Sequence, residues 1–280
     1  MPKPTKKEIR EHKSFLRRQN RYEKKYARLF LRFLENINKG VAERVESSGL
    51  AGWESVLNDY DIQTIYEDLY KRITLKEAEI SYNATVKPLL KESGQKDMID
   101  DLAGILRTGN DRVNVWRNLL NNFIEVRILK RISLVNETTK ERLTEIIQKG
   151  LDEGYGSVRI AEMIRNDTDY NQNRSLNIAR TETVTAMNQG KFLAAQSSPF
   201  VMEKRWIPVN GPRTRFGHIL MLDSPFIDMS SFFWVLNAKG IAEKGLYPGA
   251  ETFSASNTCN CRCSISFRAK RGSNGNVIRK

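Results

Sequence analysis

The sequence is poor in cysteine and histidine, with only three cysteines and two histidines among 280 residues. It has no run approaching about 18 apolar residues, the length that predicts a membrane-spanning helix. Its first seven residues, MPKPTKK, lack the apolar core of a secretory signal. We therefore expect a protein that is made in the cytoplasm, where thiols stay reduced and an odd cysteine count favours metal ligation over disulfides.

The three cysteines lie at alternate positions near the C-terminus, and one of the two histidines precedes them. Side chains at alternate positions of an extended segment point to the same face, so the three sulfurs would enter one pocket. Three thiolates and one imidazole can form a tetrahedral zinc site. The predicted ligands are His218, Cys259, Cys261 and Cys263.

Two other interpretations of these residues remain open. The cysteines can be small buried apolar side chains, with the histidine bonded to a backbone carbonyl. A Cys-His-Asn nucleophilic triad is a further alternative, although the sequence has no recognisable local signature of one.

Basic residues outnumber acidic ones, 46 to 33, which gives a formal net charge of +13. Such an excess favours an anionic partner, either nucleic acid or an acidic protein surface. The hydrophobic content of 40% is enough to bury a core. A chain of this length forms one large domain or two ordinary ones.

Much of the positive charge lies in residues 6–45, where apolar residues recur at three- and four-residue spacings and predict an amphipathic helix. Its basic face is either a solvated surface or a surface that contacts phosphates or an acidic partner. A membrane-lying helix is less well supported, because the apolar stripe is mostly aromatic and moderate in width. The candidate contact residues are Arg10, Lys13, Arg17, Arg18, Arg21, Lys24, Lys25 and Arg28.

The first half of the chain reads as helical, and the second half adds strands. After a Ser-Ser-Gly break at 47–49, helical patterns follow at 62–90, 98–132, 138–150 or 154, 157–164 and 175–196, with a polar loop predicted at 166–174. A capping box, Thr138-Thr-Lys-Glu141, predicts that a helix begins at residue 138. Strands are predicted at 204–209 and 264–267, separated first by a turn at 210–212.

We therefore predict an α+β fold, with a predominantly helical N-terminal half and a small mixed α/β C-terminal module that contains a short antiparallel sheet. The predicted divisions are a basic helical region at 1–135, the module at 136–267 and a flexible basic tail at 268–280.

Three segments of the second half occur in a particular order. Ala179-Arg-Thr-Glu182, with Ala186 and Asn188, lies on a predicted helix. Trp206 follows, with Arg213-Thr-Arg215 and His218, and Asn260-Cys-Arg-Cys263 comes last. Together they resemble the phage Mu protein F-like family, the minor head or head morphogenesis proteins of tailed bacteriophages. The resemblance covers roughly Thr138–Phe267 and departs from the family at Gly211, where an aspartate is usual.

The resemblance implies a structural virion component at the portal vertex, in contact with portal, major capsid or scaffold protein and with packaged double-stranded DNA, and made in the host cytoplasm. It also implies a metal role for His218, Cys261 and Cys263, to which this chain adds Cys259. Three function classes remain open. They are this non-enzymatic virion protein, an ADP-ribosyltransferase-like or metal-dependent enzyme, and a host nucleic-acid-binding protein. One histidine and no usefully spaced carboxylate pair argue against the enzyme.

The remaining residues of the motif are interpreted as structural. Arg180 and Glu182 are two apart on a helix and do not share a face, so we expect separate contacts. Glu182 is expected to accept hydrogen bonds from Arg213 or Arg215 and so to hold the turn that follows Trp206. The two turn arginines can instead contact phosphate.

Overall fold

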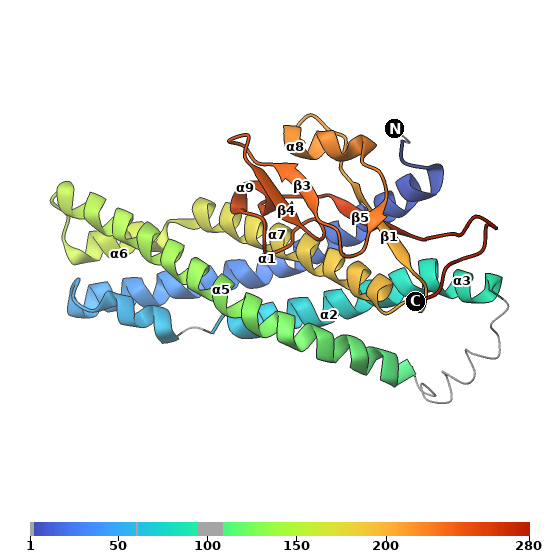
Figure 1. Cartoon of the computed structure of the whole chain (residues 1–280). Coiled ribbons are helices and arrows are strands. Elements are labelled where there is room, and N and C mark those ends of the chain that lie inside the picture. The colour runs from blue at the N-terminus through green and yellow to red at the C-terminus, as the bar shows by residue number, and fades with distance from the viewer. Residues whose placement is uncertain (1–2, 60, 94–108) are drawn as a thin grey trace. The chain divides into compact units, whose positions relative to one another are not determined.

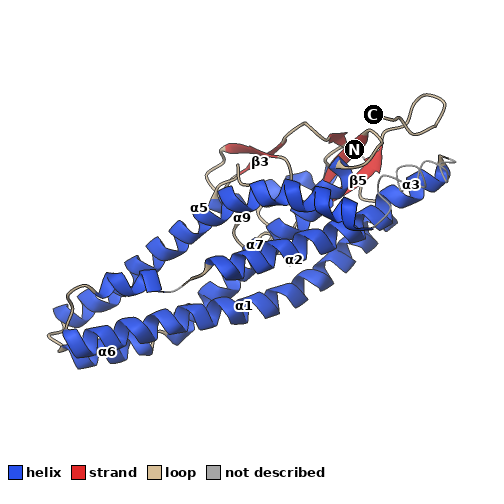
Figure 2. Ribbon diagram, turned by 90° about the horizontal axis from the view of Figure 1, so that it is seen from below, coloured by secondary structure: helices blue, strands red, loops and turns tan. Residues whose placement is uncertain are grey.

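The computed structural model describes residues 3–59, 61–93 and 109–280. Helices dominate this part of the chain, and the few strands lie in its C-terminal part (Figure 2), as the α+β prediction requires. None of the described helices combines the length and the apolar character needed to cross a membrane.

The helices and strands follow the predicted order, with long helices first. The α-helices are α1 (Lys6–Ser48), α2 (Gln63–Ser81), α3 (Lys87–Glu92), α5 (Gly109–Asp152), α6 (Ser157–Arg165), α7 (Thr168–Gln196), α8 (Phe216–Ile219) and α9 (Ala255–Thr258). The strands are β1 (Met202–Ile207), β2 (Ile227–Asp228), β3 (Phe233–Leu236), β4 (Ala242–Gly245) and β5 (Ser264–Ala269). A π-helical turn (Tyr82–Val86) joins α2 to α3, and 3-10 turns lie at Trp53–Asp59 and Leu220–Asp223.

The chain divides into two compact units, each made of separated segments. One unit contains residues 1–22, 69–123 and 180–280, and the other contains 23–68 and 124–179. Helices α1, α2, α5 and α7 contribute residues to both units. We call them the sheet unit and the helical unit.

The sheet unit contains all the described strands. Strand β1 pairs antiparallel with β5 from Met202↔Ala269 to Ile207↔Ser264 and with β2 on its other edge, while β3 and β4 form a separate hairpin (Figure 1). The core of this unit is apolar and aromatic. It comprises Phe192, Trp206, Met221, Phe233, Val235, Tyr247, Ala250, Phe253, Cys261, Cys263 and Ile265.

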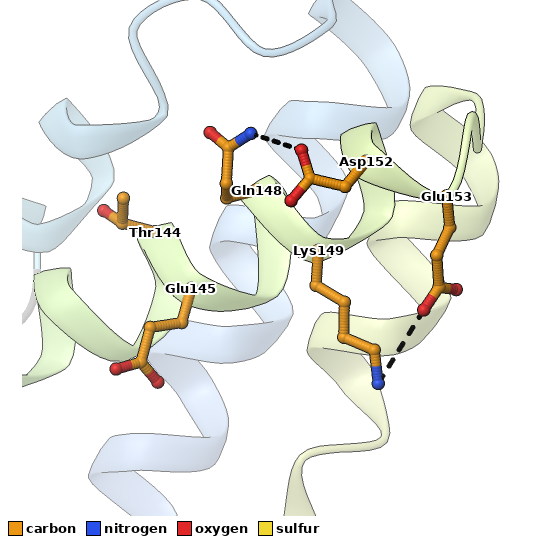
Figure 3. A pocket seen from close by; sticks show the side chains of 6 residues that line it. All are labelled: Thr144, Glu145, Gln148, Lys149, Asp152 and Glu153. Carbon is orange, nitrogen blue, oxygen red and sulfur yellow. Dashed lines mark hydrogen bonds and ion pairs between the residues drawn. The ribbon is translucent and has the colours of Figure 1, made fainter.

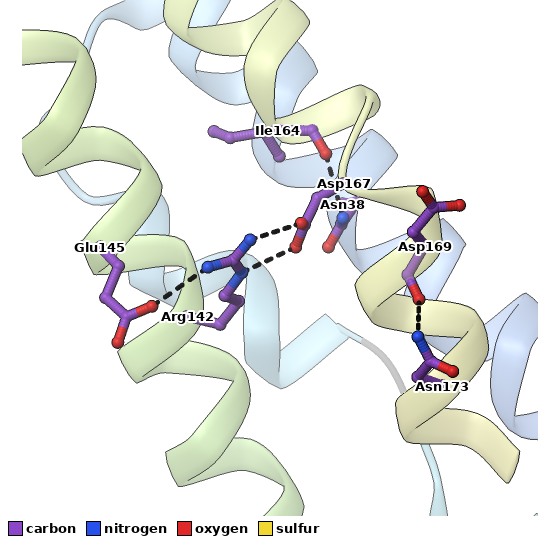
Figure 4. Close-up of polar contacts among 7 residues, drawn as sticks. All are labelled: Asn38, Arg142, Glu145, Ile164, Asp167, Asp169 and Asn173. Carbon is purple, nitrogen blue, oxygen red and sulfur yellow. Dashed lines mark hydrogen bonds and ion pairs between the residues drawn. The ribbon is translucent and has the colours of Figure 1, made fainter.

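The helical unit is held by polar contacts as well as by its apolar core (Figure 4). Arg142 on α5 donates to both oxygens of Asp167, at 3.0 and 2.7 Å, which is the bidentate geometry of a strong ion pair. The amide of Asn38 donates to the carbonyl of Ile164 at 3.0 Å. These contacts fix the junction between α6 and α7 within the unit.

Two local predictions are wrong. Thr138 does not begin a helix, because α5 continues through it and its hydroxyl donates back to the carbonyl of Leu134 at 2.8 Å. Residues 168–174 are helical rather than a loop, and Asn173 donates to the carbonyl of Asp169 within the first turns of α7 (Figure 4). The polar residues of this segment are therefore mainly the outer side of a helix.

Other local predictions are confirmed. Helix α1 ends at Ser48, and Gly49 takes a φ of 74°, the left-handed conformation that favours glycine at a helix end. The helix from Ser157 and the two main strands also form.

The tail predicted at 268–280 makes backbone contacts in the sheet unit, including isolated bridges from Phe200 to Arg279 and from Arg271 to Val277. Much of the helix predicted at 98–132 lies outside the described residues.

Candidate metal centre

The candidate site begins with His218 on the four-residue helix α8. This helix lies directly against β3, since a Cβ added at Gly217 would meet the carbonyl oxygen of Leu236 at 2.1 Å. Only glycine permits that approach. As a result the His218 side chain is buried, 2% exposed, with its ring edge against Trp206 at a centroid distance of 5.5 Å.

Cys261 and Cys263 lie in the turn that leads into β5, and both are buried. The Nδ1 atom of His218 is 3.3 Å from Sγ of Cys263 and 3.8 Å from Sγ of Cys261. The three ligand atoms all lie within 4.8 Å of one another. Two sulfurs and one imidazole nitrogen, from segments more than 40 residues apart, therefore converge at one point.

The spacing and protonation of these groups fit a metal site. Tetrahedral zinc places its sulfur and nitrogen ligands about 3.5 Å apart, close to the two distances from His218. A hydrogen bond from Cys263 lowers the pKa of Cys261 well below its usual value, although burial opposes this, and His218 adds to it. Burial, together with the Cys261 sulfur, raises the pKa of Cys263. The thiolate thus forms more readily at Cys261, whose sulfur also accepts the N–H of Cys263 at 3.4 Å.

Polar residues behind the imidazole orient it. Oδ1 of Asn257 lies 3.2 Å from Nε2 of His218, and Nδ2 of Asn257 donates to Glu243 at 2.9 Å. Because the amide nitrogen faces the carboxylate, the amide oxygen faces the ring and accepts the Nε2 proton. The lone pair on Nδ1 is then directed toward the sulfurs, as a metal ligand requires.

Glu243 is itself fixed by several donors. Burial disfavours its charge, but hydrogen bonds from Ser254, Asn237 and Asn257 hold the pKa of Glu243 at about 2. It is therefore ionised and accepts throughout the ordinary pH range. The sequence analysis missed both Asn257 and Glu243. Asn257 lies beside the cysteines in the sequence, whereas no pattern marks Glu243, which lies on the β3–β4 hairpin.

The structure does not bring Cys259 together with the other predicted ligands. Its side chain is exposed and lies outside the cluster that His218 forms with the other two cysteines. The prediction assumed an extended chain from 259, but β5 begins only at Ser264. Asn260 has a φ of 56°, which turns the backbone between the first and second cysteines. The described side chains thus supply three ligands.

The same atoms also bring together the groups of the alternative nucleophilic triad, Cys263, His218 and Asn257. The arrangement differs from a simple pair of nucleophile and base, because the sulfur of Cys261 also lies close to Nδ1 of His218. The single lone pair on Nδ1 would have to accept protons from two thiols. The geometry therefore suits a metal better than a nucleophile.

The other predicted motif residues surround this centre, but with different partners from those expected. Glu182 is buried and accepts the hydroxyl proton of Tyr70, in place of the predicted bond from Arg213 or Arg215. Arg215 donates to the carbonyl of Cys259, and Arg180 donates to Oδ1 of Asn260 at 2.9 Å. Both arginines therefore hold the cysteine turn.

Asn188 on α7 connects the helix to the same turn. Its Nδ2 donates to the carbonyls of Pro248 and Cys263, at 3.1 and 3.0 Å, and its Oδ1 accepts the N–H of Ile265 at 3.1 Å. Trp206, fully buried in β1, packs edge-on against His218, Phe233 and Phe253. Because both amide protons and the amide oxygen of Asn188 have hydrogen-bond partners, an asparagine can lie inside this core.

The candidate basic residues lie along α1. Six of the eight are exposed and make no described side-chain bond: Arg10, Lys13, Arg17, Arg21, Lys24 and Arg28. Lys25 pairs with Asp68 at 3.3 Å in the helical unit. Arg18 forms a two-bond ion pair with the buried Glu77, at 2.6 and 2.8 Å, in the sheet unit. Arg18 is therefore a structural residue.

A surface depression on α5 offers no comparable chemistry (Figure 3). Five residues of α5 and the adjoining Glu153 line it. Their polar groups pair locally, Gln148 with Asp152 at 2.8 Å and Lys149 with Glu153 at 3.9 Å. It is the outer face of a helix.

The segment that contains the site is similar to a known protein family. Residues 141–266 match the family model described as Phage Mu protein F like protein, so the resemblance inferred from the sequence is confirmed over that segment. The NAD(+)--arginine ADP-ribosyltransferase EFV of Enterococcus faecalis (strain ATCC 700802 / V583) is 29% identical over 142 residues, which is 49% of this chain but only 27% of that protein. No solved structure matches the chain.

Proposed function

Starting from the membership of residues 141–266 in the phage Mu protein F-like family, we propose that the chain is a structural minor head protein of a tailed bacteriophage. In this proposal it is a virion component that acts in head morphogenesis, next to the portal and the packaged DNA. The family match carries the assignment, and the metal centre and the basic helix supply its physical roles. The host cytoplasm is the place of synthesis and the phage head is the destination.

The arrangement of charge on α1 supports contact with DNA. In the part of α1 that belongs to the sheet unit, the exposed side chains of Arg10, Lys13, Arg17 and Arg21 fall within an arc of about 80°, at 100° per residue. At a rise of about 1.5 Å per residue they extend over about 17 Å. No acidic residue falls in this arc between its ends. We call this set the α1 basic stripe.

A linear row of cations suits a partner with a linear row of anions. DNA presents such a row, and binding through its phosphates needs no base sequence, as contact with a packaged genome requires. Each neutralised phosphate releases counterions, so binding through the stripe should weaken steeply as salt rises.

Charge reversal tests the stripe. Arg10→Glu, Arg17→Glu and Arg21→Glu together should weaken binding of a fluorescent DNA duplex, measured by anisotropy, and should lower the salt slope by about 3. The matched control reverses three exposed lysines elsewhere, Lys130, Lys140 and Lys239. Equal losses in both variants would mean that net charge alone drives the binding.

The virion assignment has its own test. Purified particles of the phage that encodes the chain should contain it in few copies by quantitative mass spectrometry, and crosslinking should connect it to the portal protein. Its absence from particles that are otherwise complete would overturn the assignment. Crosslinks to capsid or scaffold protein alone would place it elsewhere in the head.

We infer that zinc, where bound, has a structural role. It would be held by His218, Cys261 and Cys263, and it would tie α8 to the turn before β5 by replacing weak sulfur contacts with coordinate bonds. Asn257, whose amide oxygen lies against Nε2 of His218, keeps Nδ1 available as a ligand. The positive charge of the ion would also offset the free-energy cost of burying the negatively charged thiolates.

The enzyme alternative rests on the relative that is named as an ADP-ribosyltransferase. The similarity spans about a quarter of that protein, so its activity does not transfer to this chain without a direct assay. Incubation with NAD and an arginine-containing acceptor should give no nicotinamide release above that of a His218→Ala variant. Release that depends on His218 would favour the enzyme.

A further inference from the structure

A cavity of about 550 Å³ in the sheet unit is lined by the three candidate metal ligands, His218, Cys261 and Cys263, and by four arginines. The arginines come from three segments: Arg180 on α7, Arg213 and Arg215 on the turn after β1, and Arg262 between the two buried cysteines. None of the twelve residues that line it is an aspartate or glutamate. The cavity therefore concentrates positive charge from distant parts of the sequence.

The walls of the cavity are fixed by hydrogen bonds. Thr214 Oγ1 donates to the carbonyl of Val209 at 2.6 Å and accepts the N–H of Gly211 at 3.2 Å, which holds the arginine turn in shape. The N–H of Asn260, another lining residue, donates to Thr181 Oγ1 at 3.1 Å. The guanidinium groups thus extend from a framework that is set before any ligand arrives.

The two arginines of the turn after β1, Arg213 and Arg215, keep their charge available to a ligand. Arg215 donates to the backbone carbonyl of Cys259, which is a neutral acceptor. The side chain of Arg213 is exposed and makes no hydrogen bond or ion pair with the part of the chain that the structure describes. Like charges that converge on one cavity repel, and an anion in the cavity would relieve this repulsion.

The chemistry of the lining identifies the kind of anion. A guanidinium fork matches two oxygens of a phosphate, and arginines that approach from several sides suit its tetrahedral oxygens. The cavity volume lies within the usual range for small-molecule sites of about 300–1,000 Å³, which is too small to admit a double helix but sufficient for a phosphate with its substituent.

We propose that this arginine cavity is a binding site for a phosphate group, carried either by a small molecule such as a nucleotide or by a DNA strand that presents one phosphate at its mouth. Arg213 supplies the charge that is free to reorient toward the ligand, while Arg180 and Arg215 bind it from positions set by the cysteine turn. This site is separate from the α1 basic stripe, and its occupation does not depend on the virion assignment.

Isothermal titration of the full-length protein with pyrophosphate and with ADP tests the proposal. Arg213→Glu should reduce the affinity at least about tenfold, as expected for the loss of a charge-assisted bond and its replacement by repulsion. Lys239→Glu is the matched control, because it makes the same charge change at an exposed turn of the same unit, outside the cavity lining. It should leave the affinity within about twofold.

Two arms distinguish the sources of the phosphate. If pyrophosphate or ADP binds and Arg213→Glu removes the binding, the ligand is a small phosphorylated molecule. If neither binds, but Arg213→Glu weakens the binding of a short DNA strand more than Lys239→Glu does, the phosphate belongs to DNA. Equal behaviour of the two variants with every probe would overturn the proposal. Since Arg213 makes no described bond, both variants should fold, and matching thermal unfolding curves will check this.

Discussion

The imidazole Nδ1 of His218 lies 3.3 Å from the sulfur of Cys263, although 45 residues separate them. Between these two residues the chain forms the 3-10 turn at Leu220–Asp223, the β3–β4 hairpin and α9. All three pack on the core that contains Trp206 or lie beside it. The convergence is thus a product of the whole sheet unit, and it should respond to changes far from the ligands.

The first prediction concerns the ligand set. Protein purified with zinc should retain about one zinc per chain, by elemental analysis. Cys261→Ser and Cys263→Ser should each lose most of it, because a neutral hydroxyl replaces a thiolate. Cys259→Ser is the internal control and should keep the metal, since its sulfur is exposed and outside the cluster.

The outcome for Cys259 separates the two geometries directly. Equal zinc loss in all three variants would restore the four-ligand site that the sequence alone suggested. Less than about 0.2 zinc per chain in the unmodified protein, with Cys261 and Cys263 reacting freely with a thiol reagent, would eliminate the metal centre.

The difference between three and four ligands shows where sequence reasoning reached its limit. Clustering of cysteines predicted a site, and the spacing to His218 predicted a partner, and both groups do meet. The alternation argument failed because it required an extended backbone, whereas Asn260 takes a left-handed conformation that reverses the chain. A single φ angle, which the residue types do not determine, decided whether Cys259 joined the others.

Helix prediction succeeded where a helical pattern of apolar residues continued over many residues. It failed where it relied on a short run of polar residues. The spacing along residues 6–45 predicted α1 to within a few residues. The capping box at Thr138 was misleading, since the same threonine bonds back to Leu134 inside a continuous helix. A capping sequence is compatible with the N-terminus of a helix, but tertiary packing decides whether a helix begins there or continues through it.

The second prediction concerns the orientation of His218. Asn257→Leu should weaken zinc binding by about 10- to 100-fold in competition with a chelator, because the ring loses the acceptor that keeps its proton on Nε2. Asn257→Asp preserves an acceptor and should retain more affinity. If both variants bound zinc as tightly as the unmodified protein, Asn257 would have no positioning role.

The third prediction concerns Asn188, which holds the turn from inside the core. Asn188→Ala removes three hydrogen bonds and leaves the N–H of Ile265 and two carbonyls buried without this partner. We expect the free energy of unfolding to fall by about 3 kcal/mol, measured by urea denaturation. Asn177→Ala, an exposed position on the same helix, is the control and should change it by less than about 0.5 kcal/mol. A loss below about 1 kcal/mol at Asn188 would show that water replaces the missing bonds.

The fourth prediction follows from Lys204, whose side chain is buried on β1 and donates to the carbonyls of Met229 and Leu246 at 2.8 and 3.0 Å. Burial lowers its pKa from 10.5 to about 8. Between these values the unfolded chain binds more protons than the folded chain, so this residue makes the protein more stable as pH rises from 8 to 10.5. Below pH 8 the cost of burying the charge is fully present.

The size and sign of this effect can be isolated with Lys204→Met, which keeps a long flexible side chain but cannot titrate. The difference in unfolding free energy between the unmodified protein and this variant should shift by about 3 kcal/mol in favour of the unmodified protein across that pH interval. Titration of other groups cancels in the difference, because both proteins contain them. A difference that stays constant from pH 8 to 10.5 would mean that Lys204 keeps its proton in the folded core. Its two carbonyl acceptors, together with the rings of Phe192 and Phe233 at 5.3 and 5.2 Å, would then compensate for the lost hydration of the ammonium group.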